Sequence, residues 1–208
     1  MLLQNSTDST DKLIKVIPFF YGWVILFVAA LVHFSSAPGQ TYVSSIFIDH
    51  MIDDLGWSRT TFSSLYTAGS MTAAIFMVAA GRALDKFGAR KTLTTLCLMM
   101  FLATFWMSGV DSLWKLFVGY ALLRTIGQGS FGLVATTMVS TWFIRIRGRA
   151  TAISSVGGAA SLALFPFIVH ILIERFDWRN TWFILGIVVL IVLFLPALVL
   201  IRRSPEAV

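Results

Sequence analysis

One arginine stands alone inside a long apolar segment, and the chemistry of its side chain is the recognition of anions. Arg124 is the single charged residue between positions 116 and 144. Its guanidinium stays charged and presents a planar set of donors that matches a carboxylate. Because the apolar segments contain no acidic residue, the partner of Arg124 is either an anionic substrate or a group outside these segments. The structural alternative is a set of hydrogen bonds to backbone carbonyls or glutamine side chains.

Four other polar residues are candidates for the same substrate or coupling site. Gln128 lies four residues after Arg124, so a helix places both on one face and the amide can orient the guanidinium. His33 and Gln40 lie seven residues apart, on one stripe of any helix that is unbroken between them. His33 is suited to accept a proton near neutral pH, and a buried, satisfied histidine is the structural alternative. Tyr42 either reaches the same cavity or packs between helices.

The elements that must position these side chains are long apolar helices. Of the 208 residues, 57% are hydrophobic and 12% are charged, about half the charged share of a soluble domain. A helix needs about 20 apolar residues to cross a bilayer core, and six segments without Asp, Glu, Lys or Arg are long enough. They are Val16–Ile48, Thr60–Gly81, Thr92–Val110, Thr125–Ile144 with its extension over 116–123, Ala150–Ile173 and Asn180–Ile201. The sequence therefore predicts an all-α membrane protein whose six transmembrane helices form a bundle over residues 16–203.

The first of these segments is longer than one crossing requires. Pro38 and Gly39 lie near its middle, and a proline removes a backbone donor and clashes with the preceding turn. A kink or break is therefore expected there. Broken helices at membrane depth line cavities, and a simple packing kink is the alternative.

The basic residues are unevenly divided between the two ends of the predicted helices. Eleven of the 16 Lys and Arg residues flank one side and four flank the other. Cytoplasmic loops carry the excess of Lys and Arg, so both termini are expected in the cytoplasm and the bundle in the cell (inner) membrane. Residues 1–15 would then form a cytoplasmic tail. The same bias explains the net charge of +6 without a nucleic-acid partner.

The segment GRALDKFGARK, residues 81–91, joins two of the apolar segments and is expected to form a cytoplasmic loop. Its basic residues follow the cytoplasmic bias, but Asp85 at the membrane surface needs a partner. The positive N-terminal end of a helix can supply one. So can the basic residues of the next cytoplasmic connection, which are Arg145, Arg147 and Arg149.

The spacing within this segment resembles the signature between the second and third helices of major facilitator superfamily transporters. That signature has Gly, three residues, Asp, Arg or Lys, one residue, Gly, one residue and two basic residues. Its positions are filled here by Gly81, Asp85, Lys86, Gly88, Arg90 and Lys91. The sequences RTIGQG at 124–129, RGRA at 147–150 and DWR at 177–179 are also similar to family motifs. YGWV at 21–24, PGQTY at 38–42 and LGWSR at 55–59 resemble the oxalate/formate antiporter and monocarboxylate transporter group.

The resemblance covers the whole chain but only half of the family's twelve-helix architecture. It implies an N-terminal six-helix half built as a 3+3 inverted repeat, with residues 204–208 at the start of the central cytoplasmic loop. A second six-helix half, from a second copy or a separate chain, would complete the transporter. The implied function is secondary active transport of small organic anions such as mono- or dicarboxylates, as an antiporter or symporter. Neither a cofactor nor an enzymatic step is implied, and the segment around Asp85 would gate access together with Arg145 and Arg149.

The residues alone leave two other functions to consider. A non-transporting or split-transporter subunit, or a remnant that needs a partner half, would have the same helices. An intramembrane enzyme would need a serine activated by a base, but Ser70 and Ser130 lack the usual flanking pattern and His170 is poorly placed. The string GQGSFG at 127–132 matches GxGxxG, yet it lies inside an apolar helix and follows no strand. This position indicates close helix packing and not a dinucleotide site.

Overall fold

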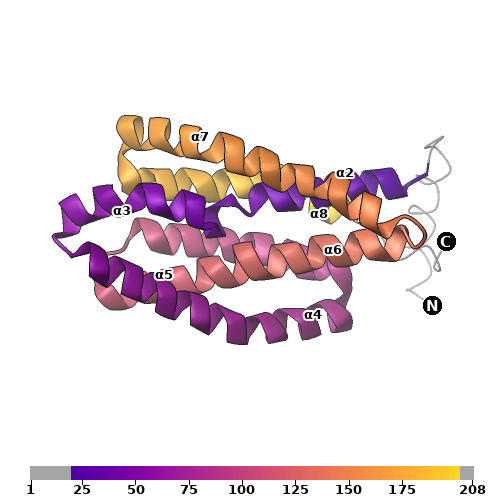
Figure 1. The fold of residues 1–208 in the computed structure, drawn as a ribbon, viewed down its shortest axis with the longest axis horizontal. Coiled ribbons are helices and arrows are strands. Elements are labelled where there is room, and N and C mark those ends of the chain that lie inside the picture. Colours follow the sequence, from indigo (N-terminus) through magenta and orange to yellow (C-terminus); the bar gives the residue numbers. More distant parts are fainter. Residues whose placement is uncertain (1–19, 202–208) are drawn as a thin grey trace, which may run out of the picture.

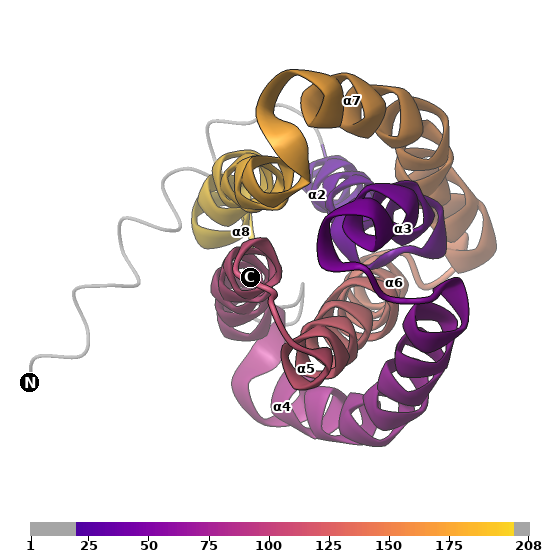
Figure 2. The ribbon, with the colours of Figure 1, turned by 90° about the vertical axis from the view of Figure 1, so that its left-hand side faces the viewer.

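The chain folds into a bundle of long helical rods. The computed structural model describes residues 20–201, and the regular elements of that part are all helical. The rods run back and forth along one long axis (Figure 1). Seen from one end, the rods lie side by side around the long axis of the bundle (Figure 2). The expected tail over residues 1–15 and the loop start at 204–208 lie outside the described residues.

The first rod is broken where the sequence predicts it. Helix α2 covers Gly22–Ser35, a single 3-10 turn η1 covers Ala37–Gly39, and helix α3 covers Thr41–Leu55. Gln40, between η1 and α3, has an extended backbone with φ −93° and ψ 151°. The predicted break at Pro38 is therefore confirmed, and it prevents His33 and Gln40 from sharing one helical stripe.

Helix α4, Arg59–Ser108, folds back on itself at one residue. Ser58 caps its start, because its Oγ accepts the Thr61 backbone N–H over 3.1 Å. Gly88, at φ 77° and ψ 166°, divides α4 into a first arm (59–87) and a second arm (89–108). The expectation of a charged loop over 81–91 is wrong, because the segment is helical on both sides of Gly88. Only glycine adopts this backbone conformation readily, so one residue suffices for the corner.

The second half of the described chain repeats this plan of a rod followed by a folded helix. Helix α5 (Leu113–Leu123), a π-helical segment η2 (Arg124–Ser130) and helix α6 (Phe131–Trp142) form one rod. Helix α7 (Arg147–Val189) turns at Asp177, which has φ 70° and ψ 159°. It continues through η3 (Leu190–Phe194) into α8 (Leu195–Leu200).

The course of the chain gathers its basic segments at one end of the bundle. The corner at Gly88 and the α6–α7 connection lie at the same end (Figure 1). The corner at Asp177, the α3–α4 link and the start of α5 lie at the other end (Figure 1). Residues 82–91 and 145–149 therefore share one end, as the count of Lys and Arg predicts.

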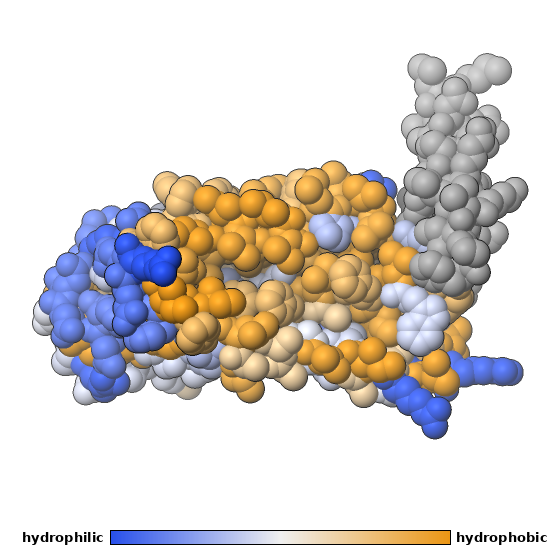
Figure 3. Space-filling view, turned by 90° about the horizontal axis from the view of Figure 1, so that it is seen from above, coloured by the Kyte–Doolittle hydropathy of each residue, from blue (hydrophilic) through white to orange (hydrophobic). Residues whose placement is uncertain are grey.

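Figure 3 shows one face of the bundle, on which a mostly hydrophobic band lies between hydrophilic regions at the two ends. By length and hydropathy alone, two described helices can cross a membrane, Arg59–Ser108 and Arg147–Leu200. The apolar helix Gly22–Ser35 is shorter. At 1.5 Å per residue, a straight helix of 50 residues would be about 75 Å long, more than twice the thickness of a bilayer core. The corner at Gly88 shortens it to two arms of membrane size.

Candidate functional site

Arg124 begins the π-helical segment η2 and is half-buried inside the bundle. Its Nε donates to Ser70 Oγ over 3.1 Å. Its Nη1 donates to the Gly39 carbonyl oxygen over 3.4 Å and to Thr41 Oγ1 over 3.3 Å. The guanidinium carbon lies 5.0 Å from the centre of the Tyr66 ring, which is within cation–π range. We call these five residues, Gly39, Thr41, Tyr66, Ser70 and Arg124, the arginine cluster.

The arginine cluster joins three rods that are far apart in the sequence. Gly39 and Thr41 come from the break between α2 and α3, whereas Tyr66 and Ser70 come from the first arm of α4. The hydroxyls of Tyr66 and Thr41 lie 2.7 Å apart. Ser70 Oγ donates to the Tyr66 carbonyl over 2.8 Å, so its lone pairs are available to Arg124. The cluster therefore fixes the guanidinium without any acidic residue.

The guanidinium keeps donors that a ligand can use. Each ion pair among the described residues involves other basic groups, and no hydrogen bond there uses Arg124 Nη2. The two Nη1 contacts are longer than the usual 2.9–3.0 Å, so they are weak and easily exchanged. A carboxylate can therefore bind in bidentate fashion along the Nη1–Nη2 edge. The hydrogen bond to the Gly39 carbonyl matches the structural alternative considered from the sequence, whereas the bonds to Ser70 and Thr41 were not part of it. Nη2 remains as a donor for an anion.

Gln128 does not make the orienting contact expected of it. Its side chain is exposed and forms no hydrogen bond to Arg124, whose Nε is bonded to Ser70 instead. Both residues lie in the π-helical segment η2, whose hydrogen bonds close over five residues. The Arg124 side chain is directed toward α4 and the break in the first rod, where its hydrogen-bond partners lie.

Three other expected site residues lie on or near the break in the first rod. Gln40 Nε2 donates to Ser36 Oγ over 3.1 Å, which fixes the amide within the break next to the arginine cluster. His33 Nε2 is buried and has no hydrogen-bond partner among the described residues. Tyr42 Oη lies 2.7 Å from Ser161 Oγ on α7, so Tyr42 packs between helices, as its structural alternative states.

The break in the first rod and the π-helical segment touch each other through two glycines. A Cβ at Gly127 would lie 2.7 Å from Gly39 Cα and 2.9 Å from the Ser36 carbonyl oxygen. A Cβ at Gly39 would collide with the Leu123 carbonyl oxygen. These distances leave no room for side chains. The contact explains the glycine at position 127 and sets the distance between the Gly39 carbonyl and Arg124.

The sequence interpretation missed the residues that hold Arg124 in place. Ser70 was considered only as a nucleophile, and Thr41 and Tyr66 were not considered. A signal was available for two of them, because Tyr66 and Ser70 lie four residues apart on an otherwise apolar segment and so share one helix face. Their partner, however, lies 54 residues beyond Ser70 in the sequence.

The basic end of the bundle does not contain the expected ion pair of Asp85. Asp85 is exposed, as are Arg145, Arg147 and Arg149. In the described part of the chain, Asp85 takes part in none of the ion pairs. These arginines, one of the two kinds of partner considered for Asp85, therefore form no ion pair with it among the described residues. Asp85 lies on the surface just before the corner at Gly88, and the three arginines lie on the surface at the α6–α7 connection and the start of α7.

Replacing Gly88 by alanine is expected to destabilise the bundle by about 1–3 kcal/mol, the cost of a side chain in this backbone region. Thermal unfolding of the purified protein in detergent, followed by circular dichroism, measures the effect. Gly81→Ala is the matched control, because a Cβ there would lie 3.7 Å from its nearest atom, Leu133 Cδ2, which is an ordinary contact distance. Asp177 has a similarly unfavourable positive φ, so Asp177→Gly is expected to remove this strain and to raise the unfolding temperature. Equal losses for Gly81→Ala and Gly88→Ala would contradict this account.

Arg179 ties together three elements at the opposite end of the bundle. Its Nη1 donates to the carbonyl oxygens of Ser108 and Val110 over 3.3 and 2.9 Å, at the C-terminal end of α4. Its Nη2 lies 3.1 Å from Asp54 Oδ2 at the end of α3. These contacts join α3, α4 and α7 through one side chain. The positive charge of Arg179 is also favourable at the C-terminal end of α4, where the helix dipole is negative.

Arg179→Gln is expected to lower the unfolding free energy by about 1–2 kcal/mol, because hydrogen bonds to charged groups stabilise more than neutral ones. Arg175→Gln, an exposed neighbour, is expected to have no measurable effect. The exposed ion pair itself contributes less than 1 kcal/mol or so, so Asp54→Asn is expected to be mild and Asp53→Asn silent. Differential scanning fluorimetry measures all four variants. A larger loss for Asp54→Asn than for Arg179→Gln would show that the carbonyl bonds do not matter.

The two serines considered for intramembrane catalysis have other roles. Ser70 Oγ accepts from Arg124 and donates to a backbone carbonyl. Ser130 Oγ donates to the Thr125 carbonyl over 2.7 Å, within the π-helical segment. Neither hydroxyl is bonded to a histidine among the described residues, and His170 Nε2 lies 3.3 Å from Glu174. Neither Ser70 nor Ser130 is therefore bonded to a base among the described residues.

Comparison with known proteins identifies relatives of this chain. The family model described as Major Facilitator Superfamily matches residues 23–208. The chain is 24% identical over 176 residues to Monocarboxylate transporter 6 of Mus musculus, a match that covers 80% of this chain and 35% of the relative. It is 26% identical over 172 residues to the Hexuronate transporter of Bacillus subtilis (strain 168), covering 81% of this chain and 39% of the relative. The chain thus spans between a third and two fifths of the length of these relatives, both of which are named as transporters.

Proposed function

Because the chain belongs to the major facilitator superfamily, we propose that it forms part of a secondary active transporter for small organic anions that carry a carboxylate. The observation that carries this proposal is the half-buried Arg124, held by neutral groups and with its Nη2 donors free of hydrogen bonds among the described residues. The names of both relatives refer to carboxylates. A guanidinium within an apolar bundle fits that chemistry.

Membership of this transporter family makes the chain an integral membrane protein. We propose that it crosses the membrane six times: by the first rod, by the two arms of α4, by the rod from α5 to α6, and by the two arms of the α7–α8 segment. The basic end with residues 82–91 and 145–149 then faces the cytoplasm, and the membrane is the cell (inner) membrane.

The plan of the bundle supports a 3+3 inverted repeat. Each proposed repeat begins with a rod that is irregular near its middle, at η1 in the first and at η2 in the second. Each continues as a helix folded at one residue. The two corners have similar backbone angles, φ 77° and ψ 166° at Gly88 and φ 70° and ψ 159° at Asp177. The two mid-rod irregularities meet at Gly39 and Gly127, beside the arginine cluster.

A second six-helix half would complete the transport pathway. Thr41 of the arginine cluster is exposed and Arg124 is half-buried, so a second bundle, from a second copy or a separate chain, would supply the opposite wall. Rocking of the two halves about the midplane would expose the anion to each side in turn. The exposed charged residues of the basic end would contact the second half and so close the pathway at that end. This gating group consists of Gly81, Asp85, Lys86, Gly88, Arg90, Lys91, Arg145 and Arg149.

The remaining site residues have proposed roles beside Arg124. Gln40 lies next to Gly39 and offers an amide to the substrate. Gln128 is exposed and contributes from the second turn of the π-helical segment. His33 is the coupling group, because its buried Nε2 has no hydrogen-bond partner among the described residues and can accept a proton. Tyr42 positions α3 against α7.

Uptake into proteoliposomes tests the proposal. Labelled lactate and glucuronate are presented to liposomes that contain the chain, with lactamide and glucose as uncharged controls. We expect carboxylate uptake that depends on an ion or counter-solute gradient and that requires a dimer or an added partner half. Equal uptake of the uncharged controls, or uptake by a monomer proven by crosslinking, would overturn the proposal.

A further inference from the structure

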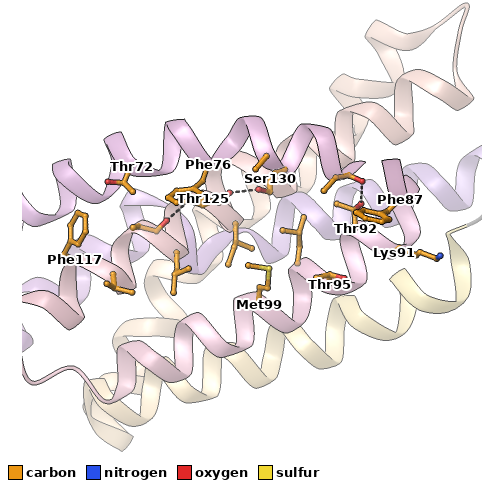
Figure 4. A pocket seen from close by; sticks show the side chains of 18 residues that line it. Thr72, Phe76, Phe87, Lys91, Thr92, Thr95, Met99, Phe117, Thr125 and Ser130 are labelled. Carbon is orange, nitrogen blue, oxygen red and sulfur yellow. Dashed lines mark hydrogen bonds between the residues drawn. The ribbon is translucent and has the colours of Figure 1, made fainter. Parts of the chain in front are cut away.

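A pocket of about 770 Å³ lies between the two arms of α4 and the rod formed by α5 and η2. The arms diverge from the corner at Gly88, and the first arm contributes three short side chains to the pocket wall, Ala79, Ala80 and Ala83. These alanines cannot fill the space between the arms. Figure 4 shows the lining side chains, with Phe117 near one end and Lys91 at the other. Arg124 does not line this pocket, so it is separate from the arginine cluster.

The lining chemistry requires an apolar occupant. Lys91 is the single charged residue among the 18 lining side chains. Four of the five hydroxyl groups in the wall are already bonded to backbone carbonyls, those of Thr72, Thr92, Thr125 and Ser130, and the fifth belongs to Thr95. A water molecule needs two to four polar partners to be stable in a cavity, and this wall offers few. The pocket therefore favours hydrocarbon over water.

The pocket opens on the apolar outer surface of the bundle. Phe76 and Phe87 line it and are 57% and 55% exposed, respectively. From Phe87 to Thr72 the first arm rises about 22 Å at 1.5 Å per residue. Half of a bilayer core is about 15 Å thick, so a chain that enters at the charged end stays within the pocket for the depth of one leaflet.

The charged end of the pocket favours an occupant whose headgroup is anionic. Lys91 is exposed and takes part in none of the ion pairs of the described chain. No acidic residue lines the pocket, and the neighbouring Arg90 is also exposed. In the orientation proposed above, this end lies at the headgroup level of the cytoplasmic leaflet, where anionic lipids attract basic side chains.

We propose that this pocket binds one acyl chain of an anionic membrane phospholipid, whose phosphate contacts the Lys91 ammonium. The bound chain fills the space between the two arms of α4. The inference rests on the proposed membrane orientation but not on transport, so binding is measured independently of any uptake.

Photo-crosslinking of a defined lipid tests the proposal. The full chain in nanodiscs is exposed to phosphatidylglycerol that carries a diazirine on one acyl chain, and labelled peptides are identified by mass spectrometry. We expect the label on residues 92–99 and 117–126. Label spread evenly over the outer surface would overturn the proposal. Competition separates the sources of the ligand: unlabelled phosphatidylglycerol is expected to displace the probe, whereas phosphatidylcholine or oleate as effective as phosphatidylglycerol would contradict a bound anionic phospholipid.

Two pairs of variants test the pocket and its charge separately. Ala80→Phe fills the pocket and is expected to reduce labelling to the level of the surrounding surface, whereas Ala74→Phe, exposed on the same arm and outside the pocket, keeps it. Lys91→Gln leaves the apolar wall intact and is expected to lower the preference for phosphatidylglycerol over phosphatidylcholine about five-fold. Arg82→Gln, exposed but not lining the pocket, is its control. Full labelling of Ala80→Phe, or equal effects of Lys91→Gln and Arg82→Gln, would overturn the proposal.

Discussion

Arg124→Gln is expected to weaken carboxylate binding about 30-fold or more. The substitution removes the charge that would pair with the anion, and loss of one partner of a buried, hydrogen-bonded ion pair costs at least about 2 kcal/mol. Equilibrium dialysis with labelled lactate and glucuronate measures the dissociation constants. Arg124→Lys keeps the charge but loses the planar fork, so its affinity is expected to lie between those of the wild type and Arg124→Gln.

The controls for Arg124 separate binding from folding. The wild-type side chain donates to Ser70, Gly39 and Thr41, so its removal also weakens the contacts between three rods. Each variant is therefore examined by thermal unfolding in parallel. Arg175→Gln removes an exposed arginine and is expected to leave binding unchanged. If Arg124→Gln unfolds like the wild type and binds carboxylates equally well, Arg124 does not belong to the binding site.

Gly127→Ala is expected to destabilise the bundle by about 1–3 kcal/mol, the usual cost of overpacking. The added methyl group would lie 2.7 Å from Gly39 Cα and 2.9 Å from Gly39 N. Both atoms belong to backbone, which cannot rotate away as a flexible side chain does. The break in the first rod must therefore shift away from the π-helical segment. Thermal unfolding in detergent is expected to show a decrease on the order of 5 °C.

The same substitution is expected to weaken carboxylate binding, because it moves the Gly39 carbonyl relative to Arg124. Gly132→Ala is the matched control in the same rod, since a Cβ at Gly132 meets no atom within 4 Å. An alanine inside a helix is favoured over glycine by about 0.5–1 kcal/mol, so Gly132→Ala is expected to be neutral or stabilising. A Gly127→Ala protein as stable as Gly132→Ala would show that the two irregular segments do not meet at these glycines.

The local properties of the chain could be predicted from its sequence. The length and composition of each apolar segment predicted helices, because both are properties of that segment alone and do not depend on its neighbours in the fold. Pro38, followed directly by Gly39, predicted the break between α2 and α3, whereas Pro166 lies inside α7 without such a break. The helix ends were predicted less well. Helix α4 continues through the charged residues on both sides of Gly88, because charges at a membrane surface do not prevent helix formation.

The contacts between rods were decided by the tertiary structure. Arg124 meets Ser70, Thr41 and Gly39 across 54, 83 and 85 residues, and no spacing rule relates positions so far apart. Gln128, which the spacing of four residues placed beside Arg124, is exposed, whereas Arg124 bonds to groups on other rods. The rotation and closeness of packed helices depend on many side chains at once, including the two glycines that allow the break to touch η2. Sequence therefore determined that an arginine lies inside an apolar helix, and packing determined which groups surround it.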